Sequence, residues 1–310
     1  MSQIKAATTE IRRFGYYIPQ SNGTVDFVVN TTVLDGVTLA ELHKIVRVVF
    51  ELQPIIVDFK VVERNYRELI DSAQEYVSQL NKLTPSLMVP ISLVMEGLIS
   101  ASQRVNNLLS SASSFLAHTE TNLRHIHGKD SSEFTTWDEM RKNIHATSFS
   151  YRFLYELRNY AQHRNIPISR INIDSKRLAD VGPIAFKVNL LILRDELLGA
   201  GYDWKKLKTE IKQQPPEIDL LPLAEEYLHG LCQICLDALK LQSTQLTLCG
   251  QYFDAWIGTM NMPVGAIPVV YIGVSDSPEN VPSSRYDIIP MEQYQYILRE
   301  YDQLVKACGL

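Results

Sequence analysis

The sequence contains few cysteines, no long hydrophobic run and no excess of positive charge. Four cysteines in 310 residues are too few for a disulfide framework. The most apolar window, Leu87 to Ile99, is interrupted by Pro90 and Glu96 and is too short to cross a bilayer. The first residues carry charges without an apolar core, unlike a secretory signal. These absences predict a cytoplasmic protein with no membrane partner.

Common nucleotide-binding and hydrolase motifs are also missing. The chain has no glycine-rich phosphate loop, no G-x-S-x-G and no H-E-x-x-H. ATPase, dehydrogenase and common hydrolase functions therefore lose support, and we expect no cofactor. With 30 Lys and Arg against 35 Asp and Glu, the formal net charge of -5 argues against bulk electrostatic binding of nucleic acid. Any nucleic acid must be held by a local site.

Two groups of residues have spacings that suggest metal ligands. His229 precedes Cys232 and Cys235, but no second Cys/His pair follows at a zinc-ribbon distance, and the flanking residues are typical of one helix with cysteines packed as small apolar residues. His125 and His127 are expected in the last turn of a helix that Gly128 ends, where a cationic imidazole suits the helix dipole. We therefore expect no metal site.

The first fifty residues combine strand and helix patterns. Residues 13–20 and 24–30 flank Asn22-Gly23, which predicts a β-hairpin. Thr38 and Glu41 form a capping box that predicts the start of a helix running to about Gln53. A small sheet and one helix are thus expected for residues 1–53.

From Pro54 the hydrophobic spacing predicts a bundle of three long helices. The first runs from Pro54 to Leu83, the second covers Leu87 to Ile126, and the third is capped by Thr136 and Glu139 and ends before Pro167. The expected buried residues of the third helix are Trp137, Met140, Ile144, Thr147, Tyr151, Leu154, Leu157 and Ala161. A helical domain is therefore predicted for residues 54–167.

Residues 168–310 have a mixed α/β pattern and no recognisable catalytic set. The predicted strands are Ile166–Asp174, Phe186–Leu193 and Val269–Val274, the predicted helices are Trp204–Gln213, Leu220–Leu248, Tyr252–Met260 and Met291–Cys308, and Ser275–Arg285 is expected to be a loop. This region either packs on the bundle and completes it, or senses a trigger and gates a site there. The fold class predicted for the whole chain is mainly α with small β additions at the N-terminus and in the C-terminal half.

The hexad R-N-Y-A-Q-H, from Arg158 to His163, contains residue types that can cleave an RNA phosphodiester without metal. An unperturbed histidine titrates near neutral pH, so His163 is the candidate general acid and base. An arginine stays protonated and stabilises the extra negative charge of a phosphorane, which is the role expected for Arg158. Asn159 lies four residues before His163 on the same helical face, and it can orient the imidazole or donate to phosphate.

Arg158 and His163 are five residues apart, which is about 140° around an ideal helix. One rigid helix would therefore not direct both side chains to one spot. A site shared between two copies of the helix removes this difficulty, so the spacing favours a homodimer.

The pattern R-N-x-x-x-H resembles the signature of HEPN-domain ribonucleases. The longer context, Y-R-F-L-Y-E-L-R-N-Y-A-Q-H-R-N-I-P-I from Tyr151 to Ile168, is similar to that of uncharacterised bacterial proteins associated with phage defence. The resemblance implies a HEPN-like helical bundle that dimerises and cuts RNA without metal, leaving a 2',3'-cyclic phosphate. It assigns the motif roles to Arg158, Asn159 and His163, and a toxin-like or anti-phage setting to the protein.

Neighbouring residues are candidates for binding the RNA substrate. Arg152, Tyr155, Glu156 and Arg164 lie on or near the same stretch, and they are expected to contact phosphate or to tune His163. From Tyr151 to Arg177 the chain has six cationic and two anionic residues, a local balance of +4 in an acidic protein. This window is the expected place for RNA.

Three alternatives to a nuclease remain open for the same residues. An amphipathic helix carries Arg, Asn, Gln and His on a solvated face without any chemistry. A catalytically inactive module would use this face to hold RNA or a protein. A regulatory protein would use the bundle to assemble a partner enzyme, and a regulatory protein partner is also expected for a nuclease that must be restrained in its host.

Overall fold

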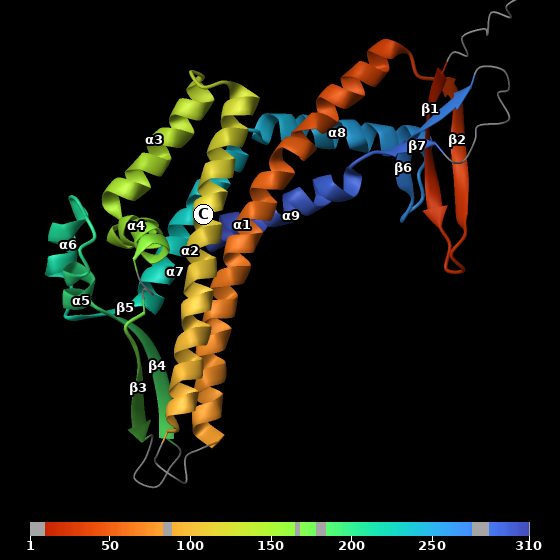
Figure 1. Ribbon diagram of the computed structural model, residues 1–310. Helices are drawn as coiled ribbons and strands as arrows, with labels where there is room; N and C mark the ends of the chain where they lie inside the picture. Colours follow the sequence, from red (N-terminus) through yellow and green to blue (C-terminus); the bar gives the residue numbers. More distant parts are fainter. Residues whose placement is uncertain (1–9, 83–88, 165–167, 178–183, 275–284, 310) are drawn as a thin grey trace, which may run out of the picture. The chain divides into compact units, whose positions relative to one another are not determined.

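The computed structural model describes residues 10–82, 89–164, 168–177, 184–274 and 285–309 (Figure 1). The chain is mainly helical, with small antiparallel sheets. It divides into two units: unit 1 contains Met1–Pro54 and Leu239–Asp302, and unit 2 contains Ile55–Ala238 and Gln303–Leu310. Each unit is therefore assembled from segments that are distant in the sequence.

Unit 1 contains a four-stranded antiparallel sheet of order β2-β1-β6-β7. Its strands are β1 (Glu10–Pro19), β2 (Val25–Val33), β6 (Ile267–Val274) and β7 (Tyr286–Ile288). The predicted hairpin is confirmed, with Gly23 at a φ of 82° in the turn. The strand predicted at Val269–Val274 is also confirmed, and it lies beside β1 rather than at a sheet edge. The loop predicted from Ser275 falls almost entirely outside the described residues.

Helices α8 (Ser243–Met260) and α9 (Met291–Ala307) contribute to the core of unit 1. Phe14 of β1 packs on Trp256 of α8, with ring centroids 4.1 Å apart. Gly250 of α8 lies against Tyr294 of α9, so closely that an added Cβ would stand 2.1 Å from the tyrosine hydroxyl. The ring of Tyr294 is held in turn by Phe253 in an edge-to-face contact.

Helix α1 (Gly36–Lys82) is continuous, so the predicted division at Pro54 is wrong. An internal proline costs a helix about 3 kcal/mol because it removes one hydrogen bond and crowds the preceding turn. Leu52, Ile55 and Ile56 are almost fully buried on both sides of Pro54, and their burial offsets this cost. The helix also starts earlier than predicted, because Asp35 rather than Thr38 caps it. The Asp35 carboxylate accepts the backbone N–H of Thr38, in the first turn, at 2.7 Å.

In unit 2, residues 55–82 of α1 run antiparallel to α2 (Ile91–His127), as Figure 1 shows. Phe59 packs edge-on against Phe115, and the Arg104 side chain donates to the Glu68 carbonyl at the other end of the pair. Gly128 ends α2 at a φ of 90°, so the expected placement of His125 and His127 in its last turn is confirmed. The predicted beginning of this helix, at Leu87, lies outside the described residues.

The third predicted helix of the bundle is divided in two by Ser148. The structure has α3 (Ser132–Thr147) and α4 (Phe149–His163), with Ser148 in an extended conformation between them. Ser131 rather than Thr136 caps α3. The predicted buried stripe is correct at Trp137, Tyr151, Leu154 and Leu157, but Thr147 is exposed, because the break at Ser148 interrupts the helical register.

The middle of the chain adds helices and a small sheet to unit 2. Strands β3 (Arg170–Arg177), β4 (Ile184–Leu193) and β5 (Glu217–Asp219) form an antiparallel sheet, which confirms the two predicted strands with shifted ends. Helices α5 (Arg194–Gly199) and α6 (Leu207–Gln213) connect β4 with β5. Helix α7 (Leu220–Lys240) packs on α3 and α4: the Trp137 indole donates to the Ile234 carbonyl, and Tyr227 contacts Tyr151 edge-on.

The long helix predicted from Leu220 to Leu248 ends early. Helix α7 stops at Lys240, and α8 begins at Ser243 after a turn in which Gln242 is buried. The Gln242 side-chain amide donates to Glu51 of α1 at 3.3 Å within unit 1, and this contact fixes the turn. Hydrophobic periodicity continues through the turn, so it gave no sign of the break.

The cysteines are packed as the sequence predicts. Cys232 and Cys235 are buried on α7, as expected for small apolar residues. The Cys232 sulfur lies 3.2 Å from that of Cys308, a contact in unit 2 that the C-x-x-C spacing did not indicate. Burial and the neighbouring Cys308 thiol raise the pKa of Cys232, so it stays a thiol near neutral pH.

Candidate functional site on helix α4

The N-terminus of α4 is fixed by its own serines and by one carboxylate of α7. Ser148 caps the helix by accepting the backbone N–H of Tyr151 at 3.0 Å. Ser148 and Ser150 donate their hydroxyl hydrogens to the two oxygens of Glu226, at 2.6 and 2.7 Å. An anion near a helix N-terminus is also favoured by the helix dipole. Glu226 thus sets the position of the helix that carries the motif.

A chain of hydrogen bonds runs along the motif face of α4. The Tyr202 hydroxyl donates to one Glu156 oxygen, and the Asn159 amide donates to the other at 3.4 Å. The Asn159 oxygen then accepts from Arg158 at 3.2 Å. Burial and the bond to Glu156 raise the pKa of Tyr202, so its hydroxyl keeps its proton and continues to donate. Two of the three motif residues are therefore ordered through a carboxylate and a tyrosine.

Beneath this face lies a cluster of aromatic rings. Trp204 stacks on Phe153 and Tyr160 of α4, with centroids 6.1 and 5.3 Å apart, and Tyr202 meets Tyr160 and Trp204 edge-on. The segment between α5 and α6 therefore covers the aromatic side of α4. The cluster is a rigid support for the end of α4.

His163 is the last residue of α4, and its side chain is exposed. Within the described part of the chain it takes part in no hydrogen bond or ion pair. Arg158 is half-buried, and its Nε has no partner among the described residues. No hydrogen bond joins the side chains of Arg158 and His163 there, which agrees with their angular separation on one helix. The structure therefore brings Arg158 and Asn159 together and leaves His163 apart.

The predicted substrate-binding arginines are engaged in contacts within unit 2. Arg152 donates to the carbonyls of His145 and Ala146 at 2.6 Å, and it pairs with Glu210 of α6 at 2.5 Å. These bonds satisfy carbonyl groups in the last turn of α3 and so stabilise the change of direction between α3 and α4. Arg164 donates to the Gly201 carbonyl at 3.1 Å.

The positive window of the sequence is partly neutralised in the fold. Glu210 pairs with Arg152, and Glu217 of β5 pairs with Arg170. Both carboxylates come from the C-terminal half, and a local count of charge from Tyr151 to Arg177 does not include them. The side chains of Lys176 and Arg177 lie outside the described residues. Unpaired positive charge at the site is therefore smaller than the sequence indicated.

Sequence reasoning did not assign a role to His145, which lies in the last turn of α3. His145 meets Tyr151 and Tyr155 edge-on, with centroids 6.0 and 6.4 Å away. Partial burial, and then the cations Arg152 and Arg141, lower its pKa, while Glu210 opposes them. Tyr155 is exposed and its ring stacks parallel to that of Tyr151. His145 and Tyr155 thus present an imidazole and an aromatic face to solvent.

Tyr202, Glu210 and Glu226 are the other positioning residues that the sequence did not identify. They come from the region after residue 168, and no local motif surrounds them. Only the packing of this region on α4 reveals their roles.

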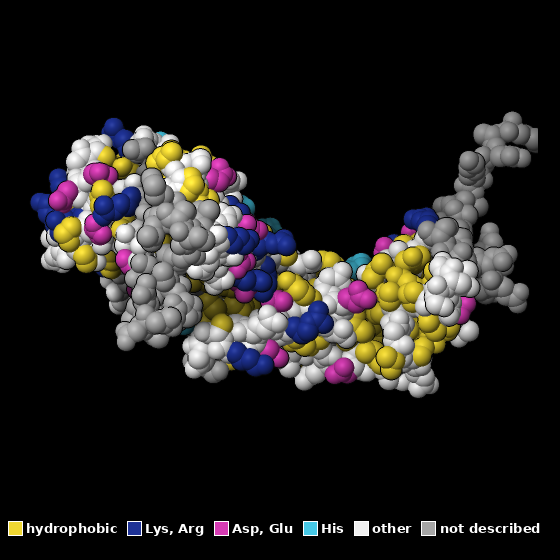
Figure 2. Space-filling view, turned by 90° about the horizontal axis from the view of Figure 1, so that it is seen from below, with side chains coloured by type: hydrophobic (Ala, Val, Ile, Leu, Met, Phe, Trp, Pro, Cys, Tyr) yellow, Lys and Arg dark blue, Asp and Glu magenta, His cyan; other side chains and the backbone are white. Residues whose placement is uncertain are grey.

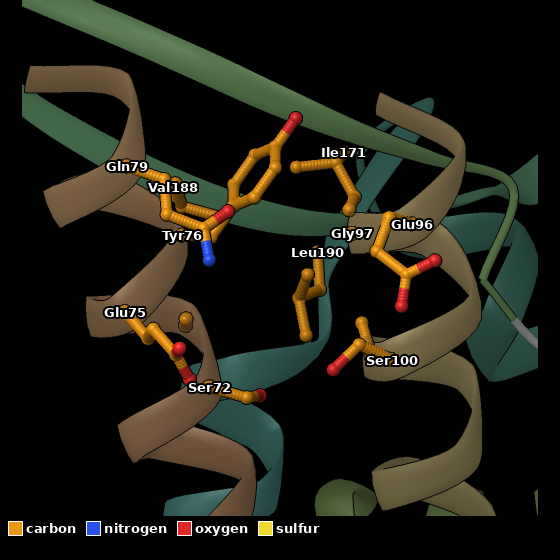
Figure 3. Close-up of a pocket in the computed structure, with 12 residues that line it drawn as sticks. Ser72, Glu75, Tyr76, Gln79, Glu96, Gly97, Ser100, Ile171, Val188 and Leu190 are labelled. Atoms are coloured by element: carbon orange, nitrogen blue, oxygen red, sulfur yellow. The ribbon is translucent and has the colours of Figure 1, made fainter. Parts of the chain in front are cut away.

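A cavity of about 150 Å³ lies elsewhere in unit 2, between α1, α2 and the small sheet. Figure 3 shows Ser72 and Glu75 on α1 facing Glu96 and Ser100 on α2, with Ile171 and Leu190 behind them. None of the motif residues lines this cavity. Its carboxylates, Glu75 and Glu96, are exposed and negatively charged, so the cavity is not suited to binding the phosphates of RNA.

Neither metals nor known proteins identify the site. Among the described residues no group of three or more His, Cys, Asp or Glu side chains is arranged to hold a metal ion. None of the helices in the described ranges has both the length and the apolar character that a bilayer crossing requires. The chain matches no protein-family model, no curated protein and no solved structure.

Proposed function

We propose that unit 2 is a HEPN-like helical bundle and that the protein is a metal-independent endoribonuclease. In this proposal His163 moves the proton between the RNA 2'-hydroxyl and the leaving 5'-oxygen. Arg158 stabilises the phosphorane, and Asn159 positions Arg158. Cleavage then leaves a 2',3'-cyclic phosphate and a 5'-hydroxyl.

The observation that carries this proposal is the state of the motif at the end of α4. His163 is exposed and makes no side-chain hydrogen bond among the described residues, so its imidazole is available to a substrate. Arg158 keeps most of its donors for another partner, since one bond to Asn159 is its only hydrogen bond within the described residues. The Tyr202–Glu156–Asn159 chain holds this arginine at a fixed place.

The separation of Arg158 and His163 supports a composite site. Two helices related by a two-fold axis would let Arg158 of one copy act with His163 of the other, and each cleft would then contain both groups. Tyr155 and His145 are available to stack on an unpaired base beside such a cleft. Arg152 and Glu210 would serve by holding the end of α3 rather than by binding phosphate.

An RNA cleavage assay with the purified protein in EDTA tests the proposal. Wild-type protein is expected to convert single-stranded RNA to products that end in a 2',3'-cyclic phosphate. His163→Ala removes the proton-transfer group, so its rate should fall at least about a hundred-fold. Gln162→Ala is the matched control, because it changes the neighbouring exposed residue of the same helix end and should retain the rate.

Two results would contradict the nuclease proposal. The first is an equal rate in the wild-type protein and in His163→Ala, which would assign the cleavage to a contaminant. The second is the absence of cleavage by wild-type protein under conditions in which it binds the RNA. Mixing Arg158→Ala with His163→Ala tests the composite site, because mixed dimers would contain one cleft with both intact groups.

A catalytically inactive binding module is the second candidate. It is favoured by the engagement of Arg152 and Arg164 with Glu210 and a backbone carbonyl, which reduces the positive charge available for a phosphorane. This module predicts that Tyr155→Ala weakens binding of single-stranded RNA by roughly tenfold through lost stacking, and that His163→Ala has no effect on any activity.

Growth arrest or anti-phage defence is the biological setting that we propose for the nuclease. A cell must restrain such an enzyme, so a regulatory protein partner is part of the proposal. Expression of wild-type protein and of the His163→Ala variant in one host tests this setting. Equal toxicity or equal phage protection with both proteins would instead support a regulatory protein that uses the bundle to assemble a partner enzyme.

A further inference from the structure

Strand β2 is an edge of the sheet in unit 1, and its pairing with β1 is regular from Val25 to Val29, before a bulge between Val29 and Val33. Its sequence, V-D-F-V-V-N-T-T-V, has no lysine, arginine or proline. Among the residues that the structure describes, the sheet order β2-β1-β6-β7 leaves one side of β2 without a neighbouring strand. Natural proteins protect such edges with lysine, proline or short length, because the free backbone groups pair readily with another strand. The free backbone groups of β2 are therefore available to another strand.

The hydrogen bonds at both ends of β2 show which backbone groups point outward. Near the turn, the Gln20 N–H donates to the Thr24 carbonyl at 2.8 Å. Beyond the other end, the Leu34 N–H donates to the Arg12 carbonyl at 2.7 Å. Residues along an antiparallel strand alternate between bonding the neighbour and facing away from it. Even-numbered residues of β2 near the turn therefore bond β1, and odd-numbered residues face away.

The outward-facing residues are Val25, Phe27 and Val29, spaced evenly about Phe27. Their N–H and carbonyl groups can pair with a further strand without any change in the hairpin. The side chains of Val25 and Phe27 are 40% and 39% exposed, and Val28 on the opposite face is 40% exposed. The face that carries Val25, Phe27 and Val29 is thus apolar, whereas Asp26 and Asn30 make the face of Val28 mixed.

An aromatic row extends this edge across one face of the sheet. Phe27 contacts Tyr17, Tyr271 and Tyr286, with ring centroids 5.9 to 6.3 Å apart. Figure 2 shows hydrophobic side chains gathered on the surface in the part of the view that contains the sheet. A strand added beside β2 would continue this apolar row.

We propose that β2 pairs antiparallel with β2 of a second copy of this chain, across a two-fold axis through Phe27. Val25 then lies opposite Val29 of the second copy, and Phe27 opposite its own counterpart. Because all three residues face outward, each pair can exchange two backbone hydrogen bonds. The two sheets become one sheet of eight strands, and the two phenylalanines meet on the aromatic face.

The symmetry and charge of the strand favour a second copy over another partner. A two-fold interface needs a surface that is complementary to itself, and three outward residues centred on one position meet this condition. The only charged residue of β2, Asp26, is bonded by Gln20 within its own hairpin and would face Val28 of the second copy. No like charges are therefore brought together in this register.

Two lysine substitutions test the pairing and its register. Phe27→Lys places two lysines opposite each other, so the dimer dissociation constant should rise roughly tenfold or more. Val28→Lys adds the same charge at an equally exposed position, but it faces Asp26 of the second copy, so dimerisation should be retained. Sedimentation velocity over a range of concentrations gives both constants, and near-UV circular dichroism checks that each variant is folded.

Cysteine cross-linking gives a second readout. Phe27→Cys places two thiols on the axis, within the separation that a disulfide requires, and should form a covalent dimer with oxidised glutathione. Val28→Cys should not, because its thiol faces Asp26. A wild-type protein that stays monomeric at all concentrations, or lysine variants that weaken a dimer equally, would overturn the proposal. The cross-link at residue 27 separates this pairing from any association through α4, since these variants leave α4 unchanged.

Discussion

At the scale of single residues, the position of α4 depends on a few polar contacts with identifiable causes. Ser148 ends α3 and caps α4, Arg152 satisfies the carbonyls at the end of α3, and Glu226 accepts from two serines. Without these contacts a backbone or side-chain donor or acceptor would lose its partner, which costs about 1–3 kcal/mol when the group is buried. These residues therefore fix the position of the helix that carries the motif, and none of them is proposed to take part in catalysis.

Ser148→Ala should lower the free energy of unfolding by about 1–2 kcal/mol, because the cap of α4 is lost and one Glu226 oxygen loses its donor. Thr147→Ala is the control: Thr147 is exposed and bonds only carbonyls of its own helix. Urea unfolding followed by circular dichroism gives both values. Equal effects in the two variants would show that Ser148 is not a cap.

The pKa of His145 predicts a pH dependence of stability. Partial burial and nearby arginines lower this pKa, so the folded protein binds the proton less readily than the unfolded chain does. Stability therefore rises with pH through the interval between the lowered pKa and the ordinary histidine value of 6.5, and it falls as the solution is acidified through that interval. In His145→Gln this contribution is absent.

Thermal unfolding of both proteins from pH 7 downward measures the effect. The melting temperature of the wild-type protein should fall more steeply than that of His145→Gln. Parallel pH profiles would show that His145 titrates alike in the folded and unfolded chains.

At the scale of elements, close approach decides where helices can pack. Gly250 allows α8 to contact Tyr294 of α9, whereas Gly258 of the same helix is exposed and has no neighbour within 4 Å of an added Cβ. The same residue type therefore has opposite expected effects at two positions of one helix.

Gly250→Ala should destabilise the protein by about 1–3 kcal/mol, because the new methyl group overlaps Tyr294, whose ring Phe253 holds in place. Gly258→Ala should be neutral or stabilise it by up to about 1 kcal/mol, since alanine restricts the unfolded chain. Urea unfolding midpoints compare the two variants. If Gly250→Ala were as stable as Gly258→Ala, the α8–α9 contact would not be tightly packed.

At the scale of the whole molecule, two units share one continuous chain, and each is closed by segments far apart in the sequence. Unit 1 contains the edge strand β2 with exposed apolar side chains, while unit 2 contains the motif. If β2 pairs with a second copy, association stabilises the native state by mass action.

The melting temperature should therefore rise more steeply with protein concentration for the wild-type protein and for Val28→Lys than for Phe27→Lys, because any association through α4 is common to all three. Differential scanning calorimetry over about a hundred-fold range of concentration measures this dependence. A melting temperature that is independent of concentration in all three proteins would argue against a dimer of the native chain.

Much of the secondary structure could be predicted from local pattern. The first hairpin follows from Asn22-Gly23 between apolar runs, and the end of α2 follows from Gly128. The errors fall where local signals compete with packing. Pro54 is a residue type that often begins a helix, but α1 continues through it because its neighbours are buried. Ser148 has no distinctive sequence context, and its role as the cap of α4 is evident only from the structure, where it also bonds Glu226.

The candidate site was predictable only in part for the same reason. Arg158, Asn159 and His163 are close in sequence, so a motif can identify them. Their partners Glu156 and Tyr202 are 46 residues apart, and Arg152 and Glu210 are 58 apart, so no short pattern connects them. The sequence predicted that Arg152 binds substrate, whereas in the structure its N–H groups bond the carbonyls at the end of α3 and the Glu210 carboxylate.

The sequence by itself determined the mainly helical class, the first hairpin, the buried faces of the long helices and the position of the motif, because these depend on interactions between residues a few positions apart. The tertiary structure alone decided the break at Ser148, the continuity of α1, the pairing of β1 with β6 and the carboxylates that engage the arginines. These features depend on which distant side chains are buried together, and burial is a property of the folded chain.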